Sequence, residues 1–472
     1  MNREKTLLKN TMIITIGKIC TQCISFLLLP LYTSILTTEE YGIVDLVNTL
    51  TGLLIPIITL QIENALFRFL IDSRDNETEK SNIIVSTLLA VSIQTLLFFI
   101  LYIIVRPFIN NSYKDFLVIN ILTYMVSSIM LQMARGLGDN LTYTIGSFIT
   151  AVFTIIFNIL LLVIFKFNAY GMIIASCIAH SVTAIYVFLS KKIYIYCSKG
   201  RFKKKVIKKL LSYSIPLIPN ALSWWIFNSS DRIIVNRVIG ISANGILAIS
   251  NKFSNLYIVI YNIFNLPWTE TASMHIKDND RDVFFNKTIN IVFRVFLAMC
   301  FGIIVCMPVI FPIMVNSQYL EAYKYIPILM IAALGNVVVG LISVIYVAEK
   351  DTKSISKTSI YAAVINILVH IILVKPIGLY AAAISTLAAY LAMSIYRIID
   401  VKRYILIKFD KSILISALIV GIYFIICYYI NNLILNIINI LLVFIYAIFI
   451  NRNSLNLIKD VIFNKIGLKK GR

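Results

Sequence analysis

Long apolar segments, separated by short polar breaks, run along the whole chain. Each is close to the length of about 20 residues that a helix needs to cross the hydrocarbon of a bilayer. The pattern therefore predicts an all-α polytopic membrane protein with about 14 transmembrane helices. The predicted spans cover residues 11–36, 41–66, 83–105, 116–135, 142–165, 170–190, 211–239, 243–267, 286–311, 320–348, 356–374, 378–400, 412–430 and 433–450.

Composition supports a membrane location. Of the 472 residues, 59% are hydrophobic and 14% are charged, and the mean hydropathy is +0.88. A soluble protein could not bury so much apolar surface. The first apolar segment ends at Thr37-Thr38-Glu39-Glu40, with no small-residue cleavage site. We therefore expect it to be a retained first span rather than a signal peptide.

The net charge of +21 predicts orientation rather than nucleic-acid binding. With the N-terminus placed inside, 33 of the 43 Lys and Arg residues fall in inner loops and tails, 6 in outer loops and 4 at membrane depth. Basic loops stay on the cytoplasmic side. We expect a multi-pass membrane protein with both termini cytoplasmic, and no nucleic-acid partner.

A weak internal repeat indicates two halves. GIVDLVNTL at 42–50 resembles GILAISNKF at 245–253, which aligns Gly42 with Gly245 at an offset of 203 residues. Asn-Ile-Leu recurs at 158–160 and 366–368. Each offset crosses six predicted spans, so the copies insert the same way up. The predicted parts are an N-terminal six-helix bundle (1–190), a basic cytoplasmic linker (191–210), a C-terminal six-helix bundle (211–400) and a transmembrane hairpin with a basic tail (401–472).

Charged and polar side chains lie inside several predicted spans. An ionisable group at membrane depth costs about 2.5–3.5 kcal/mol on insertion scales and persists where it faces a watery cavity or a partner. At 100° per residue, Asp45, Asn48 and Glu63 fall within about 60° of one line on the second span, and Lys18 and Gln22 share a face of the first. Spans seven and eight carry similar stripes, and the repeat makes these four helices equivalent.

The buried cations suggest the chemistry of a ligand. Lys and Arg suit a pyrophosphate, and Asn, Ser, Thr and Tyr suit sugar hydroxyls. Two structural readings remain open: Lys18 pairs with Asp45 or Glu63, or the Asn and Thr side chains only join helices. The candidate residues of a central substrate cavity are Lys18, Gln22, Asp45, Asn48, Glu63, Arg68, Asp231, Arg232, Asn251, Lys252, Asn255 and Arg294.

Three stretches resemble the polysaccharide flippases (Wzx/RfbX-like) of the multidrug/oligosaccharidyl-lipid/polysaccharide exporter superfamily. They are LLLPLYTSILTTEEYGIVDLVNTL from Leu27, ALFRF at 65–69 and SWWIFNSSDRIIVNRVIGISANGILAISNKF from Ser223. The Glu-Tyr-Gly and Ser-Asp-Arg elements are the most diagnostic. Many relatives have Gly-x-Tyr where this chain has Gly245-Ile246-Leu247, a mild departure.

The resemblance implies a flippase for undecaprenyl-pyrophosphate-linked oligosaccharide in surface polysaccharide biosynthesis, such as O-antigen or capsule. It implies alternating access of two lobes around a cationic cavity, without a bound cofactor or metal, with a proton or sodium gradient as candidate energy source. A polysaccharide polymerase and chain-length machinery are the candidate protein partners.

Other functions remain as alternatives. An ion-coupled multidrug exporter or a lipid II-type flippase of the same superfamily fits the same fold. A membrane glycan polymerase fits less well, because it needs catalytic groups on a sizeable outer loop and all predicted outer loops are short. The sequence contains no metal-ligand cluster, nucleotide loop or Ser/His/Asp set, so we do not expect an enzyme.

Overall fold

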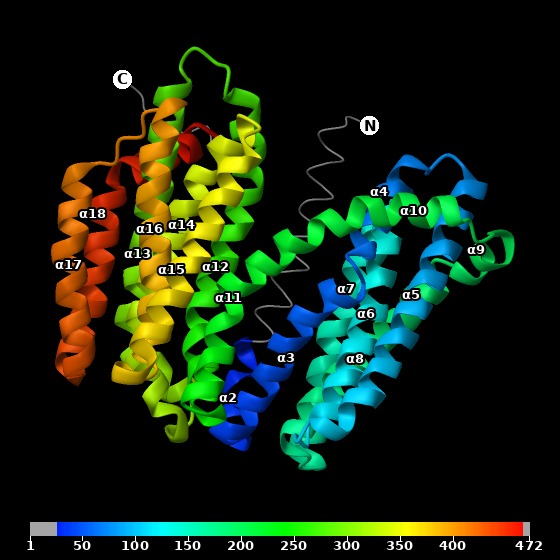
Figure 1. Cartoon of the computed structure of the whole chain (residues 1–472). Coiled ribbons are helices and arrows are strands. Elements are labelled where there is room, and N and C mark those ends of the chain that lie inside the picture. The colour runs from blue at the N-terminus through cyan, green and yellow to red at the C-terminus, as the bar shows by residue number, and fades with distance from the viewer. Residues whose placement is uncertain (1–25, 466–472) are drawn as a thin grey trace. The chain divides into compact units, whose positions relative to one another are not determined.

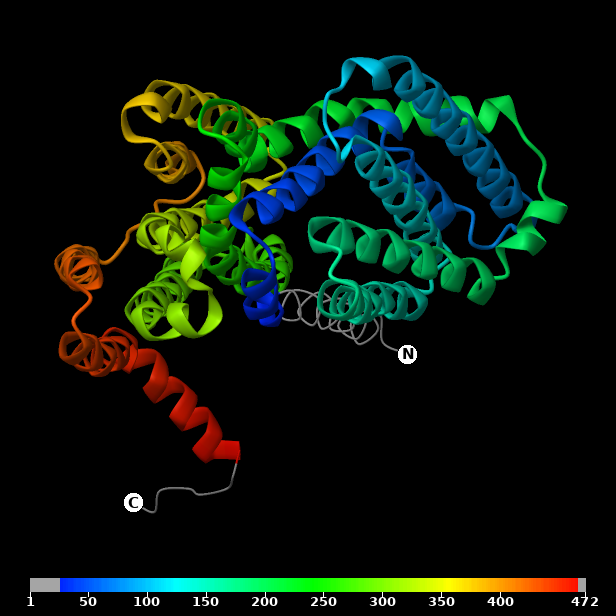
Figure 2. The same ribbon diagram turned by 90° about the horizontal axis from the view of Figure 1, so that it is seen from below.

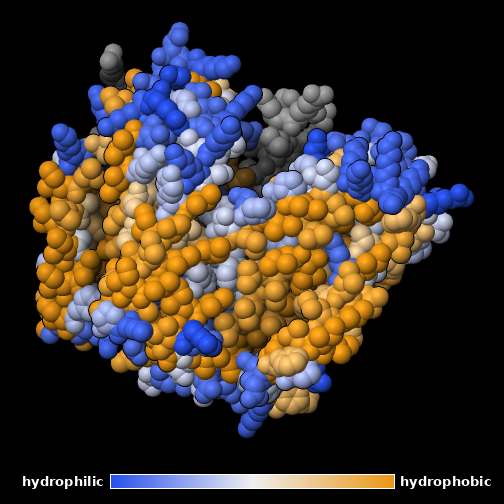
Figure 3. Space-filling model, in the orientation of Figure 1, coloured by the Kyte–Doolittle hydropathy of each residue, from blue (hydrophilic) through white to orange (hydrophobic). Residues whose placement is uncertain are grey.

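A computed structural model describes residues 26–465, and every regular element in that range is a helix. The predicted all-α class is thus confirmed. The described residues form two compact units that divide between Ala248 and Ile249, shown in Figures 1 and 2. Hydrophobic side chains cover the flanks of the helices and hydrophilic ones gather near their ends (Figure 3).

The first unit is a helical bundle. Its helices are α2 (Leu29–Ile35), α3 (Thr38–Ile58), α4 (Ile62–Asp72), α5 (Glu77–Val105), α6 (Lys114–Gly136), α7 (Asn140–Asn158), α8 (Asn168–Ser190), α9 (Ile193–Lys199), α10 (Lys204–Ser214) and α11 (Ile218–Val238). Helix α6 packs on α4, α7 and α8, and α3 packs on α6, α8 and α11. A buried apolar core joins α3, α4, α5, α6 and α8. Helix α12 (Ile241–His275) begins in this unit and continues into the second.

The second unit contains the rest of α12 and six further helices. These are α13 (Arg281–Met314), α14 (Ile326–Ala348), α15 (Thr352–Ile377), α16 (Tyr380–Asp400), α17 (Lys411–Ile430) and α18 (Leu433–Lys465). Helix α16 packs on α14 and α15, and α13 packs on α14, α17 and α18. Tyr257 of α12 donates a hydrogen bond to the carbonyl oxygen of Phe296 on α13 at 2.8 Å.

Eleven helices in residues 26–465 are long and apolar enough to cross a membrane. The predicted count of fourteen is therefore not confirmed. The first predicted span lies mostly outside the described residues. Helices α11 and α12 occupy the predicted seventh and eighth spans, but their Asn, Asp, Arg and Lys side chains lower the hydropathy.

The predicted second span is broken, and this corrects the stripe drawn along it. Helix α3 ends at Ile58, and Leu60 and Gln61 adopt left-handed backbone conformations with φ of 51° and 58° before α4 begins. The hydroxyl of Thr59 accepts a hydrogen bond from the backbone N–H of Gln61 at 3.2 Å. Glu63 therefore lies on a different helix from Asp45, and a single helical periodicity cannot relate the two side chains.

The basic linker at 191–210 is folded against the first unit. It contains α9 and the first part of α10. The backbone N–H of Arg201 donates to Asn82 Oδ1 on α5 at 2.8 Å, and that of Lys203 donates to Ser86 Oγ at 3.1 Å. The linker is thus anchored along α5. The boundaries of the predicted bundles stay a prediction, although α11 packs on α3 in the first unit.

An ion pair at the start of α7 makes acid stability testable. Burial would raise the pKa of Asp139, but its contacts with the Lys191 ammonium and with Thr142 lower it to about 2. A carboxylate whose folded pKa is depressed stabilises the fold above its unfolded pKa, and that contribution is lost as pH falls toward 2. Asp139→Asn should cost about 0.5–1 kcal/mol at pH 7, measured by thermal unfolding in detergent, and the difference should vanish near pH 2. Asp75→Asn, an exposed control, should show no such trend.

Arg397 joins three helices in the second unit without a carboxylate partner among the described residues. It is 1% exposed. Its Nε and Nη2 donate to Thr358 Oγ1 on α15 at 3.0 and 2.8 Å, and Nη1 donates to Ser343 Oγ on α14. The guanidinium therefore replaces its hydration shell with neutral oxygens fixed by the packing of the three helices.

Truncation of Arg397 should destabilise the second unit. Arg397→Ala removes several charge-assisted hydrogen bonds and leaves a cavity, partly offset by the lost desolvation cost. We expect a net loss of about 2–4 kcal/mol, seen as a lower melting temperature in detergent. The melting temperature of Arg397→Lys should lie between those of Arg397→Ala and the wild type, because a lysine ammonium cannot make all the hydrogen bonds that join α16 to α14 and α15. An unchanged melting temperature, equal to that of the exposed-site variant Lys402→Ala, would contradict this role.

Candidate functional site

Helices α3 and α11 cross antiparallel in the first unit and bring polar groups together. The indole Nε1 of Trp225 on α11 donates a hydrogen bond to the carbonyl oxygen of Thr49 on α3 at 2.9 Å. A Cβ atom at Gly52 would lie 3.6 Å from the Trp225 ring, an ordinary van der Waals contact. This contact fixes which face of α11 meets α3.

An ion-pair cluster lies further along the same crossing. Arg232 Nε on α11 donates to Asp45 Oδ2 on α3 at 2.9 Å, and its Nη1 lies 3.4 Å from Asp231 Oδ1. Asn244, in the first turn of α12, donates to Asp45 Oδ2 at 3.3 Å and to the carbonyl oxygen of Gly42 at 3.1 Å. The side chains of Arg232, Asp45 and Asp231 are 14%, 21% and 11% exposed. We refer to Asp45, Asp231, Arg232 and Asn244 as the carboxylate–arginine cluster.

The cluster lies well inside the helices that carry it. Asp45 is seven residues after the start of α3 and Arg232 is six residues before the end of α11. At 1.5 Å per residue, both lie about 10 Å from those helix ends. The cluster holds two carboxylates and one guanidinium, so its net charge is negative when both carboxylates are ionised. Arg232 Nη2 forms no hydrogen bond with any described residue, and its N–H groups could donate to another anion.

Two glycines allow α3 and α12 to touch through their backbones beside the cluster. A Cβ atom on Gly42 would lie 2.1 Å from the carbonyl oxygen of Ile241, and one on Gly245 would lie 1.9 Å from that of Thr38. Residues 38 and 42 correspond to 241 and 245 at the offset of 203 residues in the repeat. The contact is therefore reciprocal between repeat-equivalent positions, which the sequence comparison did not anticipate.

The predicted site residues of the first unit divide into three groups. Asp45, Asp231 and Arg232 meet in the cluster. Asn48 is exposed on α3. Glu63 is 7% exposed on α4, with an Oε2 that has no hydrogen-bond partner among the described residues, and Arg68 pairs with Asp72 on the same helix. Lys18 and Gln22 lie outside the described residues, so the expected pairing of Lys18 stays a prediction.

The remaining predicted site residues lie in the second unit. Asn251, Lys252 and Asn255 follow one another on α12. Arg294 on α13 pairs with Asp410 at 2.9 Å. Since Arg232 and Arg294 are both ion-paired, neither supplies an uncompensated charge in this conformation. The expected cationic cavity stays a prediction, and these two arginines do not by themselves support it.

Sequence reasoning missed Asn244, although a signal was present. Asn244 lies seven residues, or two helical turns, before Asn251, so it extends the polar line already identified on that helix. Its position beside Gly245 explains its role, since the close backbone contact brings its amide to α3.

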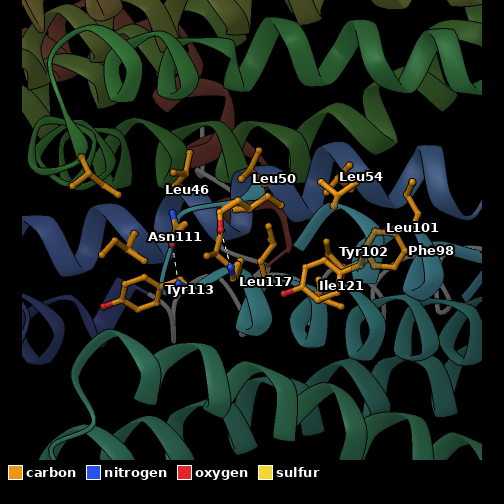
Figure 4. A pocket seen from close by; sticks show the side chains of 17 residues that line it. Leu46, Leu50, Leu54, Phe98, Leu101, Tyr102, Asn111, Tyr113, Leu117 and Ile121 are labelled. Carbon is orange, nitrogen blue, oxygen red and sulfur yellow. Dashed lines mark hydrogen bonds between the residues drawn. The ribbon is translucent and has the colours of Figure 1, made fainter. Parts of the chain in front are cut away.

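An apolar pocket of about 320 Å³ lies within the first unit, on another face of α3. Figure 4 shows it between α3, α5 and α6. Its walls are Leu46, Leu50 and Leu54 of α3, Phe98 and Leu101 of α5, and Leu117 and Ile121 of α6. Helix α3 thus presents Asp45 to α11 and its leucines to a hydrocarbon-like space.

Comparisons with known proteins agree with this architecture. A family model described as polysaccharide biosynthesis protein matches residues 7–273, which is more than half of the chain and includes the cluster. None of the curated proteins is similar enough in sequence to match.

Several solved structures share the fold. A lipid II flippase, MurJ, in an inward closed conformation is 15% identical, with a TM-score of 0.69 over 95% of this chain and 100% of that chain. An inward-facing multidrug resistance MATE transporter is 13% identical, with a TM-score of 0.66 over 81% of this chain and 95% of that one. A transporter from Pyrococcus furiosus is 13% identical, with a TM-score of 0.55 over 84% and 96%. The chain therefore belongs to the polysaccharide biosynthesis family, and it shares its fold with the MurJ flippase and the MATE transporters.

Proposed function

We propose that the protein translocates undecaprenyl-pyrophosphate-linked oligosaccharide units across the bacterial cytoplasmic membrane for surface polysaccharide biosynthesis. The family match over residues 7–273 carries this proposal. The carboxylate–arginine cluster supports it, because an arginine held inside a membrane helix bundle can exchange a carboxylate for a phosphate oxygen. Planar guanidinium groups bind both anions with the same two-point geometry.

Within this proposal, Arg232 alternates between Asp45 and the pyrophosphate of the substrate. Asp45 holds the guanidinium in place without substrate, and Asn244 keeps the Asp45 carboxylate oriented. When a pyrophosphate displaces Asp45, the freed carboxylate must be hydrated or protonated, since an unpaired buried charge is costly. Substrate binding would then be linked to proton uptake, which is one way to couple transport to a proton gradient.

A second candidate is an ion-coupled exporter of cationic compounds in the same superfamily. The specific observation in its favour is the excess of carboxylate over guanidinium in the cluster. A cation, including sodium, could bind Asp231 while Arg232 stays paired with Asp45. A lipid II-type flippase shares the phosphate chemistry of the first proposal and differs only in the glycan.

Reconstituted protein can test these functions. Proteoliposomes would carry a polyprenyl-pyrophosphate-linked oligosaccharide with a fluorescent sugar, and dithionite would report the fraction in the outer leaflet. We expect the protein to make the glycolipid of the inner leaflet accessible to dithionite, so that its fluorescence is lost. The length of the glycan should not change, and a fluorescent phosphatidylcholine should not move between leaflets. Movement of a cationic dye but not of the glycolipid would favour the exporter. A longer glycan would instead indicate a polymerase.

Orientation and partners complete the proposal. The excess of basic residues in one set of loops supports cytoplasmic termini. Cysteines introduced at residue 2 and at the C-terminus would test this through their labelling by a membrane-impermeant thiol reagent. A polysaccharide polymerase and chain-length machinery are the proposed protein partners, because a translocated unit must be joined to others to form a polymer.

A further inference from the structure

A second pocket, of about 720 Å³, lies wholly within the second unit. It is formed by the first four turns of α13 and by residues 406–410, the segment that leads into α17. Figure 1 shows both helices in this unit. None of the functions proposed above uses this pocket.

Two asparagines hold the wall of the pocket in a fixed shape. Asn286 Nδ2 donates to the carbonyl oxygen of Leu406 at 2.9 Å, and Asn286 Oδ1 accepts from the N–H of Lys408 at 2.6 Å. Asn290 repeats the pattern with the carbonyl oxygen of Lys408 at 2.9 Å and the N–H of Asp410 at 3.0 Å. Four helical residues rise about 6.0 Å and two extended residues about 6.6–6.8 Å, so the two repeats match. We call this arrangement the asparagine clamp.

The charges inside the pocket leave two ammonium groups unpaired. Arg294 pairs with Asp410, and Asp282 pairs with the adjacent Arg281. Hydrogen bonds from Ser412 and the charge of Arg294 hold the pKa of Asp410 below its usual range, so this carboxylate stays ionised. Among the described residues, no carboxylate lies within ion-pair distance of Lys287 or Lys408.

Two exposed aliphatic side chains line the pocket, which lies at the start of a long helix. Val283 is 70% exposed and Leu406 is 46% exposed. Helix α13 has 34 residues, or about 51 Å at 1.5 Å per residue, whereas the hydrocarbon is about 30 Å thick. Its first turns therefore extend to the level of lipid headgroups. Two ammonium groups in one pocket with exposed aliphatic side chains are suited to a phosphate that carries a hydrocarbon tail.

We propose that this pocket binds the phosphate of an anionic membrane lipid, with Lys287 and Lys408 as the phosphate ligands. Arg294 neutralises Asp410 beside them at 2.9 Å, so that carboxylate does not repel the phosphate. The ligand can come from a phospholipid of the bilayer or from a polyprenyl phosphate, which share this chemistry. The proposal does not depend on the transport function proposed above.

Native mass spectrometry of the full-length protein in detergent can test the site. Delipidated protein would be titrated with phosphatidylglycerol, phosphatidylcholine or a polyprenyl phosphate. We expect one phosphatidylglycerol to bind at least about tenfold more tightly than phosphatidylcholine. Displacement of that lipid by an equimolar polyprenyl phosphate would identify the polyprenyl carrier as the preferred source, and its retention would identify the bilayer phospholipid.

Two variants and a matched control make the test decisive. The double substitution Lys287→Gln/Lys408→Gln should weaken phosphatidylglycerol binding at least tenfold. Asn286→Ala/Asn290→Ala retains every charge but releases the clamp, and should weaken binding as well. Lys353→Gln/Lys402→Gln, which removes two exposed lysines elsewhere in the unit, should bind as the wild type does. Equal binding of the two phospholipids, no binding of either, or equal loss in the Lys287/Lys408 and control variants would overturn the proposal.

Discussion

Replacement of Arg232 by alanine is expected to abolish transport and to destabilise the first unit. Asp45 and Asp231 would be left partly buried with no cation beside them. Removal of one partner from a buried ion pair costs about 3–5 kcal/mol, mostly because the other charge remains unpaired. Thermal unfolding in detergent should report the loss of stability, and the dithionite assay in proteoliposomes should report the loss of transport.

Variants of Asp45 separate a structural role of Arg232 from a role in binding phosphate. The double variant Asp45→Asn/Arg232→Gln removes one charge of each sign and leaves amides that can hydrogen-bond, so much of the stability should return. Transport should remain absent if Arg232 binds the pyrophosphate, and should recover if the pair is only structural. Arg232→Lys should retain partial transport, because a lysine reaches Asp45 but lacks the two-point geometry. Transport by Arg232→Ala at half the wild-type rate or more would be inconsistent with the proposed role.

The long apolar segments were sufficient to locate the helices, since every predicted span in the described range corresponds to at least one helix. It could not place the break after α3. The stretch from Ile57 to Ile62 contains no glycine and only two polar residues, yet Leu60 and Gln61 adopt left-handed conformations. Packing of Ile62 and Leu66 into the core, both 0% exposed, compensates for that strain. Pro56 was the one local signal, and it lies before the break.

The sequence predicted which residues share a helix face but not which faces meet. Asp45 and Arg232 were both identified as charges inside equivalent spans. One open reading paired Lys18 with Asp45 or Glu63, but none paired Asp45 with Arg232. The pairing of Asp45 with Arg232 depends on how α11 lies on α3, and that is determined by the Trp225–Thr49 contact and by the glycines. Such long-range contacts leave no periodic signal in a single sequence.

The internal repeat was informative in a different way. It identified Gly42 and Gly245 as equivalent, and the structure shows these residues in reciprocal backbone contact. The sequence could reveal the equivalence but not the contact, because alignment at an offset carries no information on which residues touch.

Substitution of Gly42 by alanine should be the second most disruptive change. The new methyl group would lie 2.1 Å from the carbonyl oxygen of Ile241, so the backbones of α3 and α12 must separate by about an ångström. Overpacking of this kind costs about 1–3 kcal/mol. The separation would also stretch the hydrogen bond from Asn244 to the Gly42 carbonyl oxygen and loosen the carboxylate–arginine cluster. We expect a lower melting temperature and loss of most transport.

The chain offers a matched control on the same helix. Gly52→Ala places its methyl group 3.6 Å from Trp225, an ordinary contact, and alanine favours the helix by about 1 kcal/mol relative to glycine. This variant should be as stable as the wild type or more so. In the double variant Gly42→Ala/Gly245→Ala, one separation of the helices relieves both clashes. The double variant should therefore lose less stability than the sum of the losses in the two single variants. Equal stability and transport in Gly42→Ala and Gly52→Ala would contradict this contact, and so would additive losses of stability at Gly42 and Gly245. Either result would mean that α3 and α12 do not meet at these glycines in the working protein.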